Sequence, residues 1–207
     1  MKAWIIQTNI TKTICDEIVQ QIEEDSLFGP LRNGRLVGHK HDTKIRKSGT
    51  VLFPGTYWAA GMCAHYVNVA NRTCYNYDLN DLWSDGQIQY SLYDKNAHYT
   101  WHFDEGRTAL LESNNRNGLA KERDQLRKLS FSLQLSDPDD YEGGELELAY
   151  LTDSFEQEDK LNEDRIVVPK EIGTMVVFPS TALHRVRPVT KGTRRSLVGW
   201  AMGPPLR

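Results

Sequence analysis

The stretch Tyr99-Thr100-Trp101-His102-Phe103-Asp104-Glu105-Gly106 decides how the chain is interpreted, because it places a histidine and a carboxylate two residues apart. Its aromatic and β-branched residues favour a strand, and residues two apart on a strand point to the same face. We therefore expect His102 and Asp104 to converge, as two of the three ligands in a metal site of two histidines and one carboxylate. Because His-x-Asp pairs also occur by chance on surface strands, the interpretation requires a third ligand elsewhere.

The composition favours a single soluble globular domain. The chain has 207 residues, of which 39% are hydrophobic and 26% are charged. We expect one domain over 1–207, in which residues 1–85 support a core at 86–207. The formal net charge of −3 gives no overall attraction to nucleic acid or an anionic membrane.

Targeting signals and cysteine usage favour a cytoplasmic location. No apolar run reaches the roughly 18 residues of a membrane span. The N-terminus lacks the apolar run of a signal peptide. The three cysteines, Cys15, Cys63 and Cys74, show no CxxC spacing, which fits free thiols in a reducing compartment.

Two helices are predicted before residue 76. The isoleucines at 14, 18 and 22 form one apolar stripe, which predicts a helix that begins near Thr11 or Thr13, with acidic residues 16 and 17 in its first turn. A second helix is predicted within 55–75. In this helix His65 is expected to be a partly buried packing residue rather than a ligand. The expected apolar face consists of Trp58, Met62, His65, Tyr66 and Val69.

The segment 31–53 is basic and is punctuated by glycine. Its cations suit either a patch for an anionic substrate or a solvated hairpin edge, and we favour the edge because lysine there prevents strand-to-strand aggregation. His39, His41 and Asp42 form a rival metal cluster, but they lie in a polar turn that offers little packing to orient ligands. The cations are Arg32, Arg35, Lys40, Lys44, Arg46 and Lys47.

From Gln87 onward the hydrophobic pattern changes to the period of two that is typical of strands. Helices followed by seven or eight short strands predict a mostly β fold with flanking helices, a jelly roll or double-stranded β-helix of the cupin-like kind. The polar segment 105–124 is interpreted as a lid, and the acidic segment 152–165 as an exposed excursion. Strands are predicted at 87–106 (a pair joined near 94–97), 126–136, 143–151, 166–169, 173–180, 182–189 and 193–202.

His184 is the best candidate for the third ligand. It follows an apolar strand and a tight turn, at the start of another strand, and residues from separate strands converge in the mouth of a jelly roll. Ten residues later comes Arg194, whose charge would be costly to bury unless an anion pairs with it. A bidentate pair between a guanidinium and a carboxylate meets that requirement.

These residues belong to a longer pattern that resembles a known family. The combination of HxD, YEGGEL and FPS-x3-HRV-x-PVT-x-GTR resembles the Fe(II)- and 2-oxoglutarate-dependent oxygenases of the prolyl 4-hydroxylase-like branch, and within it the PKHD-type hydroxylases. The resemblance runs from about residue 42 to residue 200. The matching stretches are DTKIRKS (42–48), QIQYSLYDKNAHYTWHFD (87–104), RKLSFSLQLSDPDDYEGGELEL (127–148) and GTMVVFPSTALHRVRPVTKGTRRSLVGW (173–200).

The resemblance implies a metal centre and a cosubstrate site. His102, Asp104 and His184 would be the iron ligands, and Arg194 would bind the distal carboxylate of 2-oxoglutarate. Tyr93 would donate its hydroxyl to the cosubstrate, with a place in the apolar core as the alternative. The next arginine along the chain, on the same strand as Arg194, should point the opposite way.

Other matching residues are expected near the substrate. Tyr99, Arg127 and Trp200 would lie on the substrate side, and core packing is the alternative for the two aromatic residues. The glycine pair Gly143-Gly144 would shape the site without reacting, because its backbone adopts a conformation that a Cβ would hinder.

The implied cofactors are Fe(II), 2-oxoglutarate and dioxygen, with ascorbate as a further reductant. The implied reaction hydroxylates a prolyl residue of a peptide or protein, and the alternative is hydroxylation of a free amino acid or another small metabolite. No catalytic residue beyond the metal centre is required. No nucleic acid or membrane partner is expected, and no oligomeric state is implied.

Two further readings are weaker. Nucleic-acid demethylation would need a second arginine motif and a basic surface, which the sequence lacks. A vestigial binding module is disfavoured because the histidines, the aspartate and the arginine of the pattern are all intact.

Overall fold

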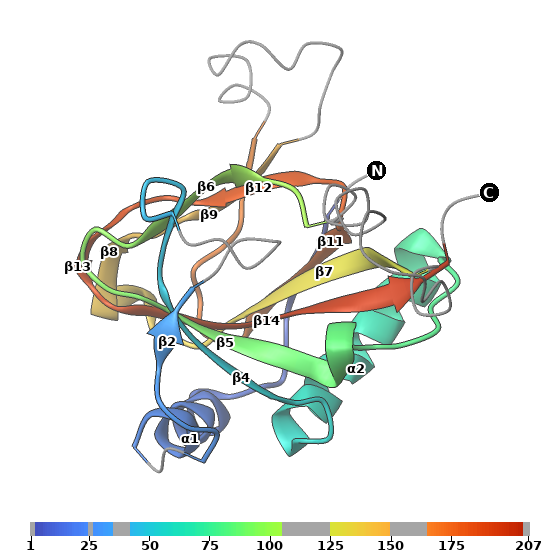
Figure 1. Cartoon of the computed structure of the whole chain (residues 1–207), viewed down its shortest axis with the longest axis horizontal. Helices are drawn as coiled ribbons and strands as arrows, with labels where there is room; N and C mark the ends of the chain where they lie inside the picture. The colour runs from blue at the N-terminus through green and yellow to red at the C-terminus, as the bar shows by residue number, and fades with distance from the viewer. Residues whose placement is uncertain (1–2, 25–26, 35–41, 105–124, 150–164, 205–207) are drawn as a thin grey trace, which may run out of the picture.

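The structure is a computed structural model that describes residues 3–24, 27–34, 42–104, 125–149 and 165–204. Two antiparallel sheets face each other, and two helices cover the outer side of the larger one (Figure 1). This arrangement confirms the predicted jelly-roll core with flanking helices. The predicted lid at 105–124 and most of the acidic segment at 152–165 lie outside the described residues.

The described elements follow the predicted order, helices first and most strands later. The helices are α1 (Lys12–Glu23) and α2 (Trp58–Ala70), which continues into a π-helical turn at Asn71–Tyr75, with short 3-10 helices at Ser84–Gly86 and Pro138–Asp140. The strands are β1 (Trp4–Gln7), β2 (Arg32–Asn33), β3 (Arg46–Lys47), β4 (Gly49–Pro54), β5 (Gln87–Tyr93), β6 (His98–His102), β7 (Leu126–Gln134), β8 (Tyr141–Gly143), β9 (Leu146–Ala149), β10 (Ile166–Val167), β11 (Thr174–Pro179), β12 (Leu183–Val186), β13 (Val189–Gly192) and β14 (Arg194–Gly203).

The larger sheet has the strand order β1-β11-β7-β14-β5-β4-β2, and the smaller sheet has the order β10-β9-β12-β6-β3. A separate ribbon pairs β13 with β8. The predicted hairpin-like pair β5 and β6 is present, but its strands belong to different sheets. The turn between them, closed by a hydrogen bond from Ala97 N to Asp94 O (2.8 Å), carries the chain from one sheet to the other.

Helix α1 forms where the apolar stripe predicts it. Ile18 and Ile22 are fully buried against the larger sheet, together with Cys15. Because the helix begins at Lys12, its acidic residues lie beyond the first turn, so the prediction that they interact with the helix dipole there was wrong.

Helix α2 is present, and Met62 and Tyr66 of the predicted face pack against the core, but the prediction was wrong for Trp58 and His65. Trp58 is 41% exposed and His65 is exposed, so His65 does not pack in the core. The physical reason is that the helix is apolar on most of its surface, and small side chains let it lie close to the sheet while bulky ones stay at its flanks. The buried residues are Ala59, Ala60, Cys63, Val67 and Ala70.

Two apolar cores flank the larger sheet and define the place of the site. One core lies between that sheet and the helices, where Phe53, Tyr90 and Leu133 are fully buried. The other includes Leu148 and Phe178 and lies between the two sheets. The space between the sheets is not filled completely, and it opens into the cavity described below.

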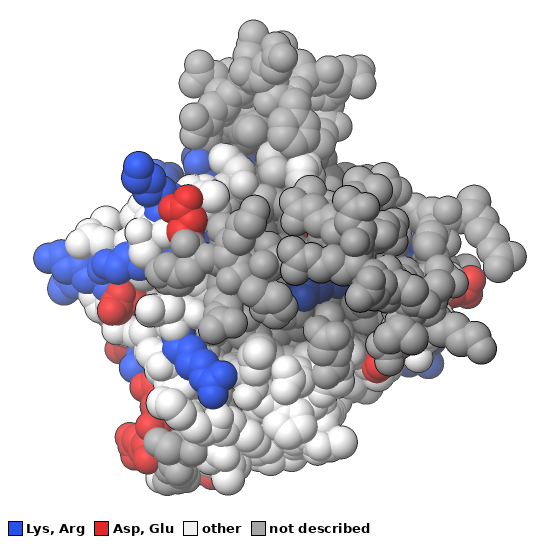
Figure 2. Space-filling model, viewed as in Figure 1, with Lys and Arg blue, Asp and Glu red and all other residues white. Residues whose placement is uncertain are grey.

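The described surface carries both signs of charge. Basic and acidic side chains lie next to one another along the left rim of the face in Figure 2. Within the described parts of the chain, neither helix has the length and apolar character required to span a bilayer.

Candidate metal centre

The pairing of β6 with β12 brings the two histidines together. His102 and His184 are direct partners in the antiparallel register, and their ring centroids are 4.0 Å apart. The register then shifts between His184 and Val186, which is the signature of a β-bulge. As a result Tyr99 faces the same side as His102, and their rings stack with centroids 3.4 Å apart.

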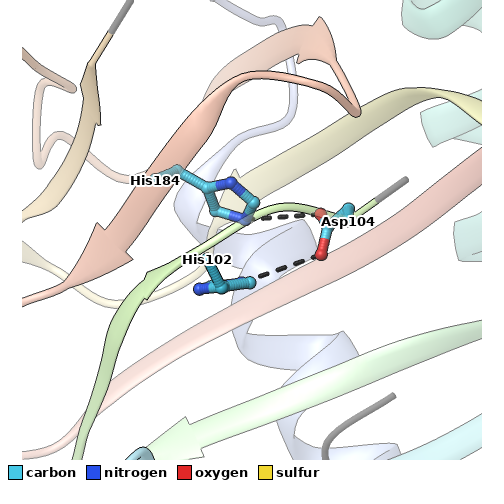
Figure 3. Close-up of side chains that lie close together, drawn as sticks. All are labelled: His102, Asp104 and His184. Carbon is cyan, nitrogen blue, oxygen red and sulfur yellow. Dashed lines mark ion pairs between the residues drawn. The ribbon is translucent and has the colours of Figure 1, made fainter. Parts of the chain in front are cut away.

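Asp104 lies just beyond the end of β6. Its backbone N–H donates to the Ser180 carbonyl (3.0 Å), which turns the carboxylate toward the two imidazoles. Asp104 Oδ1 is 3.7 Å from His102 Nε2, and Oδ2 is 3.3 Å from His184 Nε2 (Figure 3). One potential ligand atom from each of the three residues lies within 4.8 Å of the other two. The convergence expected from the sequence is therefore present.

Hydrogen bonds fix the orientation of both imidazoles. His102 Nδ1 lies 2.8 Å from the Thr100 carbonyl, and His184 Nδ1 lies 3.0 Å from the Ala182 carbonyl. A carbonyl only accepts, so each Nδ1 carries a hydrogen, and in the neutral imidazole the lone pair is then on Nε2, on the side of the centre. This is the tautomer that a metal-ligating histidine requires.

Two buried hydroxyls hold the carboxylate in place. Ser130 Oγ donates to Asp104 Oδ2 (2.8 Å) and lies 2.9 Å from Ser180 Oγ. Both serines are almost fully buried. They come from β7 and from the turn after β11, so three separate segments determine where the carboxylate lies.

The three ionisable groups are strongly coupled. Burial, and then the neighbouring His184, lower the pKa of His102 to about 3. Burial alone would lower the pKa of His184, but Asp104 raises it above its usual value. Burial alone would raise the pKa of Asp104, but the two histidines hold it well below its usual range. The carboxylate is therefore ionised, and the donor set fits a divalent transition metal such as Fe(II).

The three residues open onto a cavity between the sheets. Arg194, 3% exposed, lies on its wall as the register partner of Tyr93 across β14 and β5. The cavity therefore has a metal-binding cluster and a buried guanidinium. Among the residues singled out in the sequence, the lining includes His102, Asp104, His184, Arg194, Tyr93, Tyr99 and Trp200.

Arg127 lies next to this cavity rather than in its wall. Its guanidinium stacks on the Trp200 ring, 4.0 Å from the centroid. Arg195 points the opposite way from Arg194, as expected, and binds the Glu23 carboxylate of α1 through Nε (3.0 Å) and Nη2 (3.2 Å).

Arg46 is the residue that sequence reasoning misjudged. It lines the cavity at 6% exposure, donates from Nε to Ser48 Oγ (2.9 Å) and lies 4.8 Å from the centre of the Tyr99 ring. The prediction of a solvated edge holds for Lys47 but was wrong for Arg46. The sequence contained a usable signal, because Arg46, Ser48 and Thr50 are polar residues spaced by two and therefore share one face of a strand. The structure shows that all three are buried.

The rival metal cluster is not assembled by any described residues. His39 and His41 lie outside the described residues, and Asp42 is exposed. Within the described parts of the chain, His102, Asp104 and His184 form the one group of three possible ligands.

A comparison with protein families identifies the family of the chain. Residues 88–202, more than half of the chain, match the family model of the 2OG-Fe(II) oxygenase superfamily. The chain belongs to the 2OG-Fe(II) oxygenase superfamily. The region of this superfamily member that matches contains His102, Asp104, His184 and Arg194.

Curated relatives point to one group within the superfamily. A PKHD-type hydroxylase of Xylella fastidiosa is 34% identical over 112 residues, which cover 54% of this chain and 42% of the relative. The first curated relatives that match are covered over only 27–42% of their own length.

Solved structures of other oxygenases share the fold. A prolyl hydroxylase from Trichoplax adhaerens, solved with a hypoxia inducible factor peptide fragment, has a TM-score of 0.68 at 18% identity, covering 96% of this chain and 82% of that one. An alpha ketoglutarate dependent carbocyclase from nogalamycin biosynthesis has a TM-score of 0.65 at 14% identity, covering 97% and 79%. At these identities the likeness shows the fold alone, and the carbocyclase shows that the fold serves more than one reaction.

Proposed function

We propose that the protein is an Fe(II)- and 2-oxoglutarate-dependent dioxygenase that hydroxylates prolyl residues of a peptide or protein. The observation that carries this proposal is the shared cavity, in which a cluster of two histidines and one aspartate lies with a buried arginine. Similarity to PKHD-type hydroxylases and the fold of prolyl hydroxylases support the choice of prolyl residues.

The chain's own residues have distinct tasks in this proposal. His102 and His184 bind the iron through Nε2, and Asp104 binds it through a carboxylate oxygen. When iron, 2-oxoglutarate and dioxygen are bound, they supply the oxidising chemistry that converts 2-oxoglutarate to succinate and carbon dioxide and adds one oxygen atom to the substrate. Arg194 binds the distal carboxylate of 2-oxoglutarate in a charge-assisted pair, and Tyr93 donates its hydroxyl to the cosubstrate.

The substrate approaches from the side of the cavity that bears aromatic and basic side chains. Tyr99 and Trp200 line the cavity, each with a guanidinium against its ring, from Arg46 and Arg127 respectively. Aromatic walls and guanidinium donors suit the ring of proline and the carbonyl groups of a peptide. Ascorbate serves as an accessory reductant in this proposal.

Succinate release tests the reaction and the substrate class together. The purified protein would be incubated with Fe(II), 2-oxoglutarate and a panel of prolyl peptides, each matched by the same peptide with alanine in place of proline. Hydroxylation is expected to add one oxygen atom to the prolyl peptide alone, together with succinate. Equal oxidation of both peptides in a pair would contradict prolyl specificity.

Hydroxylation of a free amino acid or small metabolite is the second candidate. The carbocyclase with the same fold favours including it, since that enzyme belongs to nogalamycin biosynthesis rather than to peptide modification. Succinate release driven by free amino acids, with every peptide left unmodified, would establish this candidate and eliminate the first.

A further inference from the structure

A hollow of about 240 Å³ lies against β6 and β12 on the outer face of the smaller sheet, away from the metal-binding cluster. The two strands run side by side (Figure 1), and their register shifts between His184 and Val186 because β6 has one more residue than β12 in that interval. Thr100 and Trp101 of β6 therefore lie together opposite Arg185 of β12. Since His184 faces the metal cavity, its neighbour Arg185 points to the outer face.

The walls of the hollow combine an aromatic ring, apolar side chains and cations. The Arg185 guanidinium lies over the Trp101 ring, 4.4 Å from its centroid. Val186 and Pro188 add apolar surface, and Arg187 adds a second guanidinium. Among the described residues, no carboxylate lines the hollow. The hollow therefore suits an occupant that carries both apolar groups and negative charge.

Three arginines share one carboxylate at the edge of the hollow. Glu147, the register partner of Arg185 on β9, is 1% exposed. Its carboxylate lies 2.7 Å from Arg185 Nε and 3.0 Å from Arg165 Nε, whereas Arg187 Nη1 lies 3.8 Å away, too far for a hydrogen bond. Three positive charges around one negative charge leave this described cluster with an excess of positive charge, which favours an anionic partner.

Arg187 is the cation that is best placed to receive an anion. Glu147 and the Trp101 ring hold Arg185, while the side chain of Arg187 is 49% exposed. The backbone N–H of Arg187 donates to the Glu145 carbonyl (2.9 Å), which fixes the base of the side chain beside the hollow. A carboxylate of an incoming ligand can therefore form a bidentate pair with a guanidinium whose starting point is already ordered.

The other groups of the hollow favour a polypeptide over a simple anion. The indole Nε1 of Trp101 is buried, and no acceptor for its hydrogen is recorded among the described residues. A buried donor without an acceptor is unfavourable, so a carbonyl oxygen that reaches the indole would be stabilised. Val186 and Pro188 offer apolar contacts that an inorganic anion cannot use. A nucleic acid is less suitable, because it needs a row of cations along its phosphates and the net charge of the chain is −3.

We propose that this hollow is a docking site for an acidic segment of a partner polypeptide, in which carboxylates alternate with apolar side chains. A carboxylate of the segment pairs with Arg187, and its apolar side chains pack on Val186, Pro188 and the Trp101 ring. The site lies outside the metal cavity and goes beyond the proposed function, because it requires neither iron nor 2-oxoglutarate.

Fluorescence anisotropy tests the site directly. The full chain, without added metal or 2-oxo acid, would be titrated into a labelled peptide in which glutamate alternates with leucine. A peptide with lysine in place of every glutamate is the matched probe of opposite charge. We expect the acidic peptide to bind, with an affinity that falls as salt is added, and the basic peptide to bind far more weakly.

Three variants locate the binding. Arg187→Glu reverses the charge at a half-exposed side chain and should weaken the acidic peptide by about 10-fold or more. Thr100→Phe fills the hollow without changing the charge and should also abolish binding, since the Thr100 side chain is exposed at its wall. Lys12→Glu, at an exposed position on α1, makes the same change in net charge as Arg187→Glu and should bind like the wild type. Circular dichroism would confirm that each variant is folded.

The outcomes are independent of the hydroxylation assay. Loss of binding in Arg187→Glu and Thr100→Phe, with Lys12→Glu unchanged, would establish the site even if no prolyl peptide is oxidised. Absence of binding to the wild type, equal binding of the basic peptide, or equal losses in Arg187→Glu and Lys12→Glu would overturn the inference and leave the proposed function standing. Tighter binding of a labelled oligonucleotide than of the acidic peptide, lost in Arg187→Glu, would overturn it in favour of nucleic acid.

Discussion

At the scale of single residues, the site depends on hydrogen bonds that fix each ligand before any metal arrives. The carbonyls of Thr100 and Ala182 select the tautomers of the two histidines, and Ser130 orients Asp104. Metal ligands held in this way do not need to reorganise on binding, so the groups behind them affect metal affinity as well as geometry.

Spectroscopy should distinguish the role of the metal ligands from the role of Arg194. His102→Ala removes one ligand, and we expect it to abolish the charge-transfer band of the anaerobic Fe(II)–2-oxoglutarate complex. Arg194→Ala leaves the metal centre intact and should weaken the binding of 2-oxoglutarate by about 1.5–3 kcal/mol, the usual contribution of a hydrogen bond to a charged group. A band of normal intensity in His102→Ala would show that His102 is not a ligand.

Ser130 should affect metal affinity without touching the metal. Ser130→Ala removes the donor to Asp104 Oδ2, and we expect the affinity for Mn(II), measured by calorimetry in the absence of 2-oxoglutarate, to fall about 10- to 100-fold. Ser130→Thr keeps a hydroxyl and is expected to retain most of the affinity. Equal losses in both variants would indicate a packing defect instead.

The sequence was sufficient to predict the three converging residues, but part of the reasoning behind them was incomplete. His102 and Asp104 were expected to share the face of one strand, whereas β6 ends at His102 and a hydrogen bond to Ser180 turns Asp104 inward. Strict alternation along the strand would also separate Tyr99 from His102. The bulge that stacks the two rings depends on pairing with β12, which no local pattern encodes.

At the scale of elements, α1 is connected to the cavity through the larger sheet. Glu23, near its C-terminus, binds Arg195 in two hydrogen bonds and also contacts the hydroxyl of Tyr90 on β5. Arg194, the preceding residue, faces the cavity from the other side of the same strand. This network fixes the start of β14 against a helix that lies far from it in the sequence.

Removing the Glu23 charge should therefore destabilise the fold. In Glu23→Gln the bidentate pair is lost while the shape is kept, and we expect urea denaturation to show a loss of about 1–3 kcal/mol. Asp16→Asn is the matched control on the same helix, because its pair with Lys12 is exposed, and no measurable change is expected there. Equal stability of both variants would show that the Glu23 pair contributes little.

The elements that sequence patterns predicted best are those whose two sides differ in polarity, even where both sides are buried, as they are in β7. The isoleucine stripe of α1 and the alternation in β7 are unambiguous, because each separates a polar side from an apolar one. Helix α2 has no such separation, so its buried face depends on which side chains are small enough to approach the sheet. Arg46 was misplaced for a related reason, since its burial depends on a partner ring, Tyr99, from another strand.

At the scale of the whole molecule, thiol reactivity reports whether the two helices are packed against the larger sheet. Cys15 and Cys63 are buried between the helices and the larger sheet, and Cys74 is exposed. Burial raises the pKa of Cys15 to about 11 and that of Cys63 further, so neither thiol ionises near pH 8.

We expect one thiol to react with a disulfide reagent in the native protein at pH 8, and three to react after denaturation. Cys74→Ser should reduce the native value to zero. Rapid reaction of all three thiols in the native protein would contradict the burial of α1 and α2 against the sheet.

The elements before residue 86 determine whether the rest of this superfamily member can fold as a separate fragment. The family model begins at residue 88, yet β1 pairs with β11, β4 pairs with β5, and α1 and α2 cover the apolar side of the larger sheet. A fragment of residues 86–207 would expose that side to water and should be recovered as aggregate. The portion that carries the chemistry therefore depends on a portion outside the family model, whose part in the fold is to shield the apolar side of the sheet from water.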